Sequence, residues 1–157
     1  MASKMGSDMN SQIIRADSHE LVAVAQLFNE YRQYYEQGDD MAAVTAFIEQ
    51  RLSRQDSIIL IAKNNKGEGL GFLQMYWQLS SLDMSEFLII NDLFVTQSAR
   101  GQGVARKLMA TAIEIGINQG CKRLTLETAS TNYKAQSLYE TLGFRRDNHY
   151  YHYQLDI

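Results

Sequence analysis

The chain has 157 residues, of which 45% are hydrophobic and 21% are charged, and its formal net charge is -3. This length suits one ordinary folded domain, and the composition excludes extensive disorder. A slightly acidic chain lacks the basic patch that binds nucleic acid or anionic membranes, so we expect neither partner, whereas a cationic small substrate is compatible with the charge. The single cysteine, Cys121, excludes an internal disulfide, and the short apolar runs predict neither a membrane span nor a signal sequence, so we expect a cytoplasmic protein.

The N-terminal part of the chain begins with a polar stretch and continues with two helices. Residues 1–11 are expected to form a flexible tail, so that residues 12–157 make up a single domain. A short strand is predicted at residues 13–16. Two helices follow, because apolar residues recur every three or four positions from Leu21 to Tyr35 and from Met41 to Leu52. These two helices are predicted to form a pair.

The middle of the chain alternates extended segments with turns. Aliphatic and β-branched residues predict strands at 57–63 and 70–77, and the glycine-containing turn between them predicts a hairpin. A loop is expected at 79–85, before a third strand at 86–95.

The C-terminal part of the chain alternates helices with strands. Helices are predicted at 103–119 and 132–142, each followed by a glycine, with a strand at 122–128 between them. Side chains alternate between apolar and polar from 151 to 157, which predicts a final strand. The order β-α-α-β-β-β-α-β-α-β therefore indicates an α/β fold in which a mixed sheet carries helices on both faces.

Residues 100–105, Arg-Gly-Gln-Gly-Val-Ala, lie where a predicted strand gives way to a helix N-terminus. Gly101 and Gly103 let a ligand approach the backbone closely, and the unpaired N–H groups of a first helical turn favour an anion. Arg100 or Arg106 would add positive charge. A dinucleotide fingerprint would need Gly or Ala at Arg106, and a P-loop would need Gly-Lys-Ser/Thr, which is absent. A diphosphate is therefore the expected ligand, although a turn that merely connects two elements would have the same glycines.

Three segments of the chain match one known pattern in the same order. The turn has the form Arg100-x-x-Gly103-x-Ala105, and the strand Ile-Asn-Asp-Leu-Phe-Val at 90–95 precedes it. The pattern Asn132-x-x-Ala135-x-x-x-Tyr139-x-x-x-Gly143-Phe144 follows it. Together these segments resemble the GCN5-related N-acetyltransferase (GNAT) family, over roughly residues 57–144. The resemblance implies a GNAT-type fold, with a mixed, mostly antiparallel sheet flanked by helices on both faces, and an enzyme that uses acetyl-coenzyme A (acetyl-CoA) as co-substrate without a metal.

The resemblance also implies which residues contact acetyl-CoA. The strand backbone at Leu93, Phe94 and Val95 would bond the pantetheine and the acetyl carbonyl, and Asn132 would contact the cofactor from its helix start. The residues of the turn that would bind the diphosphate are Arg100, Gly101, Gln102, Gly103, Val104, Ala105 and Arg106. Without the resemblance, an ordinary N-cap is the commoner use of Asn132.

Tyr139 is the general acid that the resemblance implies. A thiol has a pKa of about 8.5 and a phenol has a pKa of about 10, so a phenol beside the sulfur can stabilise and protonate the departing thiolate. Spacing alone favours core packing for Tyr139, because Ala135, Leu138 and Leu142 form an apolar stripe with it.

A lysine-like amine has a pKa of about 10.4 and is protonated at neutral pH, so the acceptor amine must lose a proton before it attacks. Asp92 is the first candidate for the base, and Glu127 and ordered water are the alternatives. Several relatives that use a carboxylate have Glu at the position of Asn91, and an amide cannot accept this proton. Strict strand alternation could also turn Asp92 away from the site, where its carboxylate would cap or pair nearby.

The acceptor side has weaker candidates. Aromatic and acidic residues of the first helix could surround a cationic acceptor, although core packing is the simpler interpretation of Tyr31 and Tyr35. These residues are Glu30, Tyr31, Tyr34, Tyr35 and Glu36. Trp77, Glu86 and the 79–85 loop are further candidates without a motif. His149 and His152 would point to opposite faces of a strand, so no metal site is expected.

The sequence therefore predicts an acetyl-CoA-dependent N-acetyltransferase that acetylates a primary amine by direct attack in a ternary complex. A small-molecule acceptor, such as a polyamine or an amino acid, is favoured. The alternatives are a catalytically silent acyl-CoA-binding regulatory module and a protein acetyltransferase that acts on lysine or on an N-terminus. A homodimer is an open alternative to a monomer, because the aromatic final strand would supply an edge.

Overall fold

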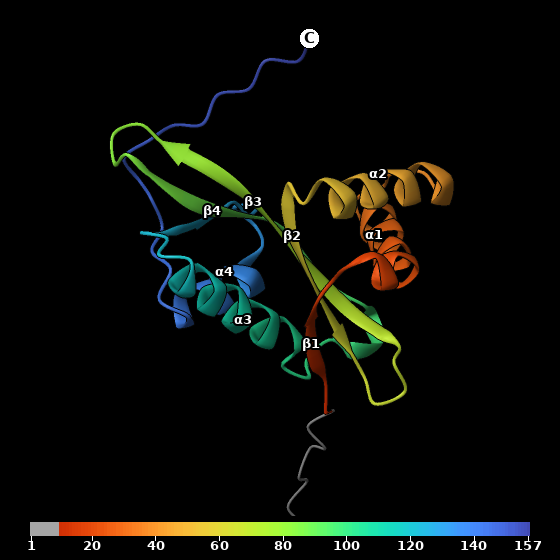
Figure 1. Cartoon of the computed structure of the whole chain (residues 1–157). Helices are drawn as coiled ribbons and strands as arrows, with labels where there is room; N and C mark the ends of the chain where they lie inside the picture. The colour runs from red at the N-terminus through yellow and green to blue at the C-terminus, as the bar shows by residue number, and fades with distance from the viewer. Residues whose placement is uncertain (1–9) are drawn as a thin grey trace, which may run out of the picture. The chain divides into compact units, whose positions relative to one another are not determined.

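The structure is a computed structural model that describes residues 10–157 (Figure 1). The chain divides into two units, Met1–Glu127 and Thr128–Ile157. Most of the expected N-terminal tail, residues 1–9, lies outside the described residues, and one domain over 12–157 stays a prediction. Within the described residues, no helix is both long enough and apolar enough to cross a membrane.

The first unit is built on one sheet whose five strands lie in the order β1-β2-β3-β4-β5. The strands are β1 (Gln12–Arg15), β2 (Ser57–Lys63), β3 (Gly69–Ser80), β4 (Ser85–Val95) and β5 (Leu124–Leu126). Every neighbouring pair is antiparallel except β4 and β5, which run parallel. The predicted mixed, mostly antiparallel sheet is therefore confirmed.

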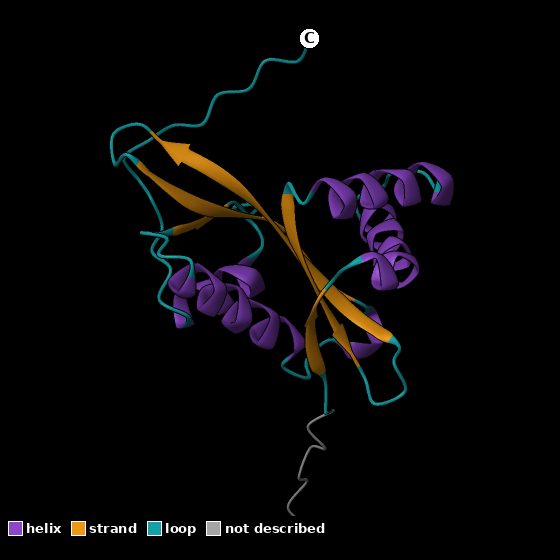
Figure 2. Ribbon diagram, in the orientation of Figure 1, coloured by secondary structure: helices purple, strands orange, loops and turns teal. Residues whose placement is uncertain are grey.

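Helices cover both faces of this sheet, as Figures 1 and 2 show. The helices are α1 (Leu21–Tyr34), α2 (Met41–Arg54) and α3 (Val104–Asn118), with short 3-10 turns η1 (Ser18–Glu20) and η2 (Gln97–Ala99). The pair α1 and α2 lies on one side and α3 on the other. Because both sides are covered, the interior strand β2 is buried along its length from residue 57 to residue 62. Its continuous aliphatic sequence follows from that position.

The two faces of the sheet have separate cores. On the face toward α1 and α2, called here the α1–α2 face, Ile59, Ile61 and Phe72 pack against buried residues such as Val24 and Ile48. Strand alternation turns the intervening residues of β2, including Leu60, toward α3. The buried side chains of α3 that meet this second face are Val104, Leu108, Met109 and Ala112.

Two segments of the first unit differ from the sequence-based expectations. The loop expected at 79–85 is shorter, because β3 extends to Ser80 and β4 starts at Ser85. Asp83 closes the turn, since its backbone N–H donates to Ser80 Oγ at 3.2 Å and its carboxylate accepts from the same hydroxyl at 2.9 Å. The strand expected at 122–128 is limited to Leu124–Leu126, the residues that pair with β4.

The second unit contains the helix α4 (Tyr133–Thr141), close to its predicted bounds. The final strand expected at 151–157 is wrong, because none of the residues after α4 forms a strand. The alternating side chains of this segment, Tyr151, Tyr153, Leu155 and Ile157, are all exposed. Alternation shows which side chains would share a face, but a strand also needs a paired neighbour. The strand edge expected for a homodimer is therefore not formed.

Candidate active site

Strand β4 continues beyond its parallel partner. The pairing between β4 and β5 covers only Leu88 to Ile90, whereas β4 runs on to Val95. Among the described residues, no strand pairs with 91–95 on the side of β5. We call residues 91–95 the β4 edge. Its backbone groups on that side have no strand partner, and the Val95 carbonyl accepts a side-chain hydrogen bond instead, so an extended ligand could bind along this edge as a strand does.

The β4 edge leads into the glycine turn and then into α3. Gly101 and Gly103 have φ angles of 76° and 78°, which are left-handed conformations that favour glycine. The first helical hydrogen bond is donated by the Lys107 N–H to the Gly103 carbonyl at 3.1 Å, so the N–H groups of residues 104–106 precede it. A Cβ at either glycine would meet no protein atom within 4 Å. The turn therefore offers open space in front of backbone amides, which fits the diphosphate of acetyl-CoA.

Arg100 connects this turn to both β4 and α1. Its Nε donates to the Val95 carbonyl at 3.0 Å, and its guanidinium lies 5.1 Å from the Tyr34 ring centroid and 5.9 Å from that of Phe94. The side chain thus packs on aromatic faces as well as adding charge to the turn. Gln102 also braces the turn, because its Nε2 donates to the Ser98 carbonyl at 2.9 Å.

A β-bulge determines where Asp92 points. Ile90 is paired with Met75, and Asp92 is paired with Gln74, so Asn91 is an extra residue without a register partner. Met75 and Gln74 are adjacent and face opposite sides of the sheet, so Ile90 and Asp92 do as well. Asp92 lies on the α1–α2 face with Phe94, which belongs to that core. Strict alternation would have turned its carboxylate to the other side.

The Asp92 carboxylate is buried and hydrogen-bonded. The residue is 8% exposed, Asn91 Nδ2 donates to its Oδ2 at 3.1 Å, and the Tyr31 side chain acts on it as a further group that favours its ionised form. Burial raises the pKa of Asp92 above its ordinary value, and the side chains of Asn91 and Tyr31 oppose that rise. A carboxylate with a raised pKa is better matched to accepting a proton near neutral pH.

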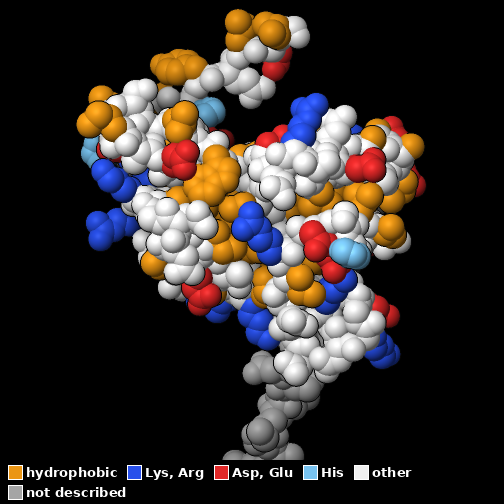
Figure 3. Space-filling view, viewed as in Figure 1, with side chains coloured by type: hydrophobic (Ala, Val, Ile, Leu, Met, Phe, Trp, Pro, Cys, Tyr) orange, Lys and Arg blue, Asp and Glu red, His pale blue; other side chains and the backbone are white. Residues whose placement is uncertain are grey.

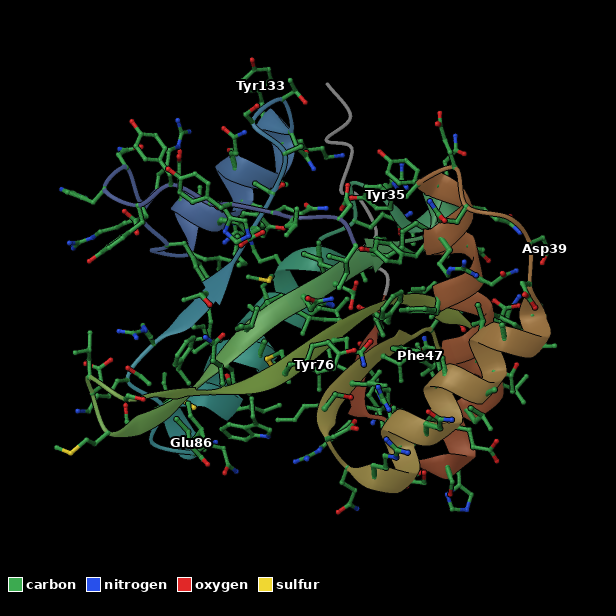
Figure 4. The ribbon with its side chains drawn as sticks, turned by 90° about the horizontal axis from the view of Figure 1, so that it is seen from above. Tyr35, Asp39, Phe47, Tyr76, Glu86 and Tyr133 are labelled. Atoms are coloured by element: carbon green, nitrogen blue, oxygen red, sulfur yellow. The ribbon has the colours of Figure 1, made fainter. Side chains whose placement is uncertain are left out.

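A polar cluster next to Asp92 was missed by sequence reasoning. Gln74 is fully buried, and its Nε2 donates to Ser57 Oγ at 3.1 Å. Tyr76 is half-buried, and burial followed by the negative charge of Asp92 raises the pKa of its phenol. Figure 4 labels Tyr76 on β3 and Phe47 on α2. A glutamine between hydrophobic residues in a buried strand was the available signal.

An open groove of about 660 Å³ is lined in part by Ser57, the hydrogen-bond partner of Gln74. Its lining includes charged residues of both signs, namely Arg15, Asp17, Glu49 and Arg51. The Arg51 guanidinium lies 4.9 Å from the Phe47 ring centroid, and its Nε is 3.1 Å from an Asp56 carboxylate oxygen. The approach to Asp56 does not have hydrogen-bond geometry, so the contact balances charge without satisfying the Nε donor.

Other candidates are not brought to Asp92. Trp77 is paired with Leu88 and shares the α3 side of the sheet with Met75. Glu86 is exposed at the hairpin end of β4, away from α1 and α2 in Figure 4. Glu127 follows β5 and is exposed. These positions leave Asp92 as the carboxylate of the β4 edge.

Core packing, which was expected for two aromatic residues at the end of α1, is found for only one of them. Tyr31 packs against the core of the α1–α2 face, as expected. Tyr35 is 56% exposed, so the expectation of core packing is wrong for it. Tyr35 follows the last residue of α1, where the chain leaves the sheet. Tyr34 is also exposed, and its ring contacts Arg100 instead of enclosing Asp92.

Neither the charges on the face drawn in Figure 3 nor the metal-ligating groups of residues 10–157 mark a further site. Acidic and basic side chains are interspersed over the described surface visible in Figure 3, between hydrophobic patches. In residues 10–157, no group of three or more His, Cys, Asp or Glu side chains is arranged to hold a metal ion.

The second unit contains the two remaining predicted residues. Asn132 is the N-cap of α4, and its Oδ1 accepts from the Ala135 N–H at 3.2 Å. The half-buried Tyr139 ring lies 6.1 Å from the Phe144 ring, centroid to centroid. The N-cap of Asn132 is thus confirmed, while its contact with the cofactor and the acid role of Tyr139 stay predictions.

Gly71 is a further residue that supports the site and was not singled out from the sequence. A Cβ at Gly71 would lie 2.5 Å from the Phe94 carbonyl oxygen and 3.1 Å from the Val95 Cα. Only glycine therefore allows β3 to approach the β4 edge this closely. The signal available was a glycine inside a strand pattern, which often marks a close approach of backbones.

Comparisons with known proteins agree on one family. The model of the family described as "Acetyltransferase (GNAT) family" matches residues 23–144. The uncharacterized N-acetyltransferase YhfO of Bacillus subtilis (strain 168) is 41% identical over 145 residues, which cover 92% of this chain and 97% of that protein. A crystal structure described as that of a probable acetyltransferase has a TM-score of 0.88 at 34% identity, covering 93% of this chain and 97% of the other.

More distant matches have named acceptors of different kinds. The structure of AAC(6')-Iy in complex with a CoA-containing bisubstrate analog has a TM-score of 0.77 at 24% identity, covering 94% of this chain and 99% of the other, and so shows the fold alone. Shorter sequence matches include an N-alpha-acetyltransferase of Arabidopsis thaliana and an aminoglycoside N(6')-acetyltransferase of Salmonella typhimurium, over 41% and 42% of this chain. The family match and the full-length relatives are consistent with the β4 edge and its glycine turn: the chain belongs to the acetyltransferase (GNAT) family and is an N-acetyltransferase.

Proposed function

We propose that the chain transfers an acetyl group from acetyl-CoA to a primary amine of a small molecule, by direct attack in a ternary complex. One observation carries this proposal. The buried Asp92 carboxylate lies on the same strand as the unpaired β4 edge, which leads directly into the turn of Gly101 and Gly103. A proton acceptor and an anion-binding turn are thus connected by one stretch of backbone.

The residues of the turn and the β4 edge fit acetyl-CoA. Backbone groups of Leu93, Phe94 and Val95 would bond the pantetheine, and the amides of residues 101–106 would hold the diphosphate. Arg100 and Arg106 would add positive charge, with Asn132 as a further contact from α4. The thioester of acetyl-CoA supplies the acetyl group, and the remaining chemistry is the transfer of two protons.

Two side chains would handle these protons. Asp92 accepts one from the attacking amine as the new C–N bond forms, and its raised pKa suits that role. Tyr139 donates its phenolic proton to the sulfur as the C–S bond breaks. One N–H proton is lost and one S–H bond is formed, so the two residues return to their starting states through solvent. No other co-reactant is needed.

We take the groove beside Ser57 as the candidate acceptor site, although its lining does not include Asp92. Its volume of about 660 Å³ falls within the usual range for sites that bind small molecules. Its mixed charges fit an acceptor that has several polar groups in addition to the amine. Relatives include enzymes named as an N-alpha-acetyltransferase and as an aminoglycoside N(6')-acetyltransferase, so the acceptor class has to be decided by assay.

The decisive assay measures CoA release from acetyl-CoA over a panel of polyamines, amino acids, aminoglycosides and peptides. We expect release with at least one small amine, a loss of turnover in Asp92→Asn, and slower turnover in Tyr139→Phe with nearly unchanged acetyl-CoA affinity. Glu127→Gln serves as the matched control, because Glu127 is an exposed carboxylate that follows the neighbouring strand. Tight acetyl-CoA binding without release for any amine would instead support the silent regulatory module.

A further inference from the structure

Tyr31 makes the contact from α1 to the candidate base. Its ring packs beside Phe94, two residues after Asp92, and its phenol opposes the rise that burial causes in the pKa of Asp92, whose carboxylate accepts from Asn91 Nδ2 at 3.1 Å. We propose that Tyr31 and Asn91 are positioning residues, which together hold the Asp92 carboxylate in the orientation that accepts the proton of the acceptor amine. This inference rests on the proposed function, because it assigns a role to the surroundings of Asp92.

The Tyr31 ring is held in place from several directions. Its centroid lies 5.7 Å from that of Phe72, 6.0 Å from that of Phe94 and 5.9 Å from that of Phe28. The contacts with Phe72 and Phe94 are edge-on, a favoured arrangement of aromatic rings. A ring packed in this way has few rotamers open to it, so its hydroxyl meets Asp92 in a defined direction.

Phe72 and Phe94 also place the Tyr31 ring next to the polar register pair Gln74 and Asp92. Phe94 is two residues after Asp92 on the same face of β4, about 6.6 Å along the strand. Phe72 and Phe94 are register partners, as are Gln74 and Asp92. The ring therefore rests on the aromatic pair while its hydroxyl meets the carboxylate of the adjacent pair. This arrangement depends on the bulge at Asn91, which turns Asp92 to the α1–α2 face.

Asn91 has a role here that differs from the expected one. The Asn91 amide was expected only to be unable to accept the proton, whereas it donates a hydrogen bond to the carboxylate one residue later. The base thus follows the bulge residue, and the amide of that residue supports it. An ionised carboxylate has about four acceptor sites, so two donors leave sites for the amine.

The titratable groups that act on Asp92 are two phenols. Tyr31 reaches it from α1, and Tyr76 interacts with it electrostatically from β3. Removal of the Tyr31 hydroxyl deletes a donor that favours the ionised carboxylate, so the pKa of Asp92 should rise further. More of the base would then be protonated at neutral pH, and the carboxylate would be held by one donor instead of two.

The test compares Tyr31→Phe with Tyr35→Phe. Both variants remove one hydroxyl near the end of α1 and keep the ring, but Tyr35 is exposed. The Asp92 carboxyl carbon is titrated by ¹³C NMR, with its signal assigned by its loss in Asp92→Asn, and kcat is measured against pH with the best amine. In Tyr31→Phe we expect a higher Asp92 pKa, an acid limb of kcat moved to higher pH, and a roughly tenfold to hundredfold lower kcat at pH 7. Acetyl-CoA KM should be unchanged.

The outcomes separate this inference from the proposed function. An Asp92 pKa that is the same in Tyr31→Phe and the wild type overturns the positioning role, and so does an equal shift in Tyr35→Phe. Asn91→Ala, which removes the other donor from an exposed position, should move the Asp92 pKa in the same direction. If the wild type acetylates no amine, the proposed function fails, and the NMR titration still decides whether Tyr31 and Asn91 hold the carboxylate.

Discussion

The diphosphate site can be tested by comparing Gly103→Ala with Gly120→Ala. The φ angles of these glycines are 78° and 72°, and a Cβ at either one meets no protein atom within 4 Å. Alanine in this left-handed conformation costs about 1–2 kcal/mol, offset by about 0.4–1 kcal/mol from the less flexible unfolded chain. Each variant should therefore lose about 1 kcal/mol of unfolding free energy and melt about 2–4 °C lower.

Only one of the two variants should affect coenzyme A. Gly103 precedes α3 and Gly120 follows it, so the two positions lie about 25 Å apart along the helix. The added methyl group at position 103 would project into the open space in front of the amides. The loss of one charge-assisted hydrogen bond, about 1.5–3 kcal/mol, would weaken coenzyme A binding tenfold or more. Calorimetric titration should show this loss in Gly103→Ala and wild-type affinity in Gly120→Ala. Equal coenzyme A affinities in the two variants would refute the placement of the diphosphate.

Two further predictions concern the β4 edge. Gly71→Ala should lower the unfolding free energy by about 1–3 kcal/mol and weaken coenzyme A binding, because backbone of β4 must move. In Gly69→Ala the tightest contact of the new Cβ is the movable Leu27 side chain at 2.9 Å, so this variant should lose less unfolding free energy in denaturant titration, and an equal loss would contradict the argument. Asp92→Asn should stabilise the fold while abolishing turnover. Burial raises the pKa of Asp92 in the folded state. The folded wild type is therefore most stable below the unfolded-state pKa of about 3.9, where Asp92 is protonated, and it loses that stability as pH rises through the folded-state pKa. The unfolding free energy of Asp92→Asn, measured in urea, should exceed that of the wild type by an amount that grows over that pH window and then stays constant. A difference independent of pH would contradict the burial argument.

Local patterns were enough to predict most of the elements. The run at 57–63 is aliphatic because β2 is covered on both faces, and its predicted bounds are those of the structure. The helix α2 was marked by an apolar stripe that includes the buried residues Val44 and Ile48. The alternating segment 151–157 had an equally clear pattern, but pairing is a property of the neighbour and not of the segment. This difference explains why the final strand was wrong.

The direction of Asp92 could not be predicted from β4 alone. A bulge is defined by two strands, because the extra residue Asn91 is recognised only when Ile90 and Asp92 are paired with adjacent residues of β3. Period-two alternation along β4 would place Ile90 and Asp92 on one face. The action of Tyr31 on Asp92 depends in turn on that direction, so it could not be anticipated either. The positioning role proposed for Tyr31 therefore depends on the register between β3 and β4.

The cofactor side and the acceptor side of this enzyme differ in how they are encoded. The turn at 100–105 is contiguous, and it offers backbone amides whose direction is set by left-handed glycines, so a short motif is sufficient to describe it. The surroundings of Asp92 come from α1, β2 and β3, which contribute Tyr31, Ser57 and Gln74. These are side-chain contacts between segments far apart in sequence, and each can change without altering the turn. Under the proposed function, the acetyl donor is thus read by the turn and the acceptor by residues next to Asp92, so substitutions next to Asp92 should change amine preference while leaving coenzyme A affinity intact.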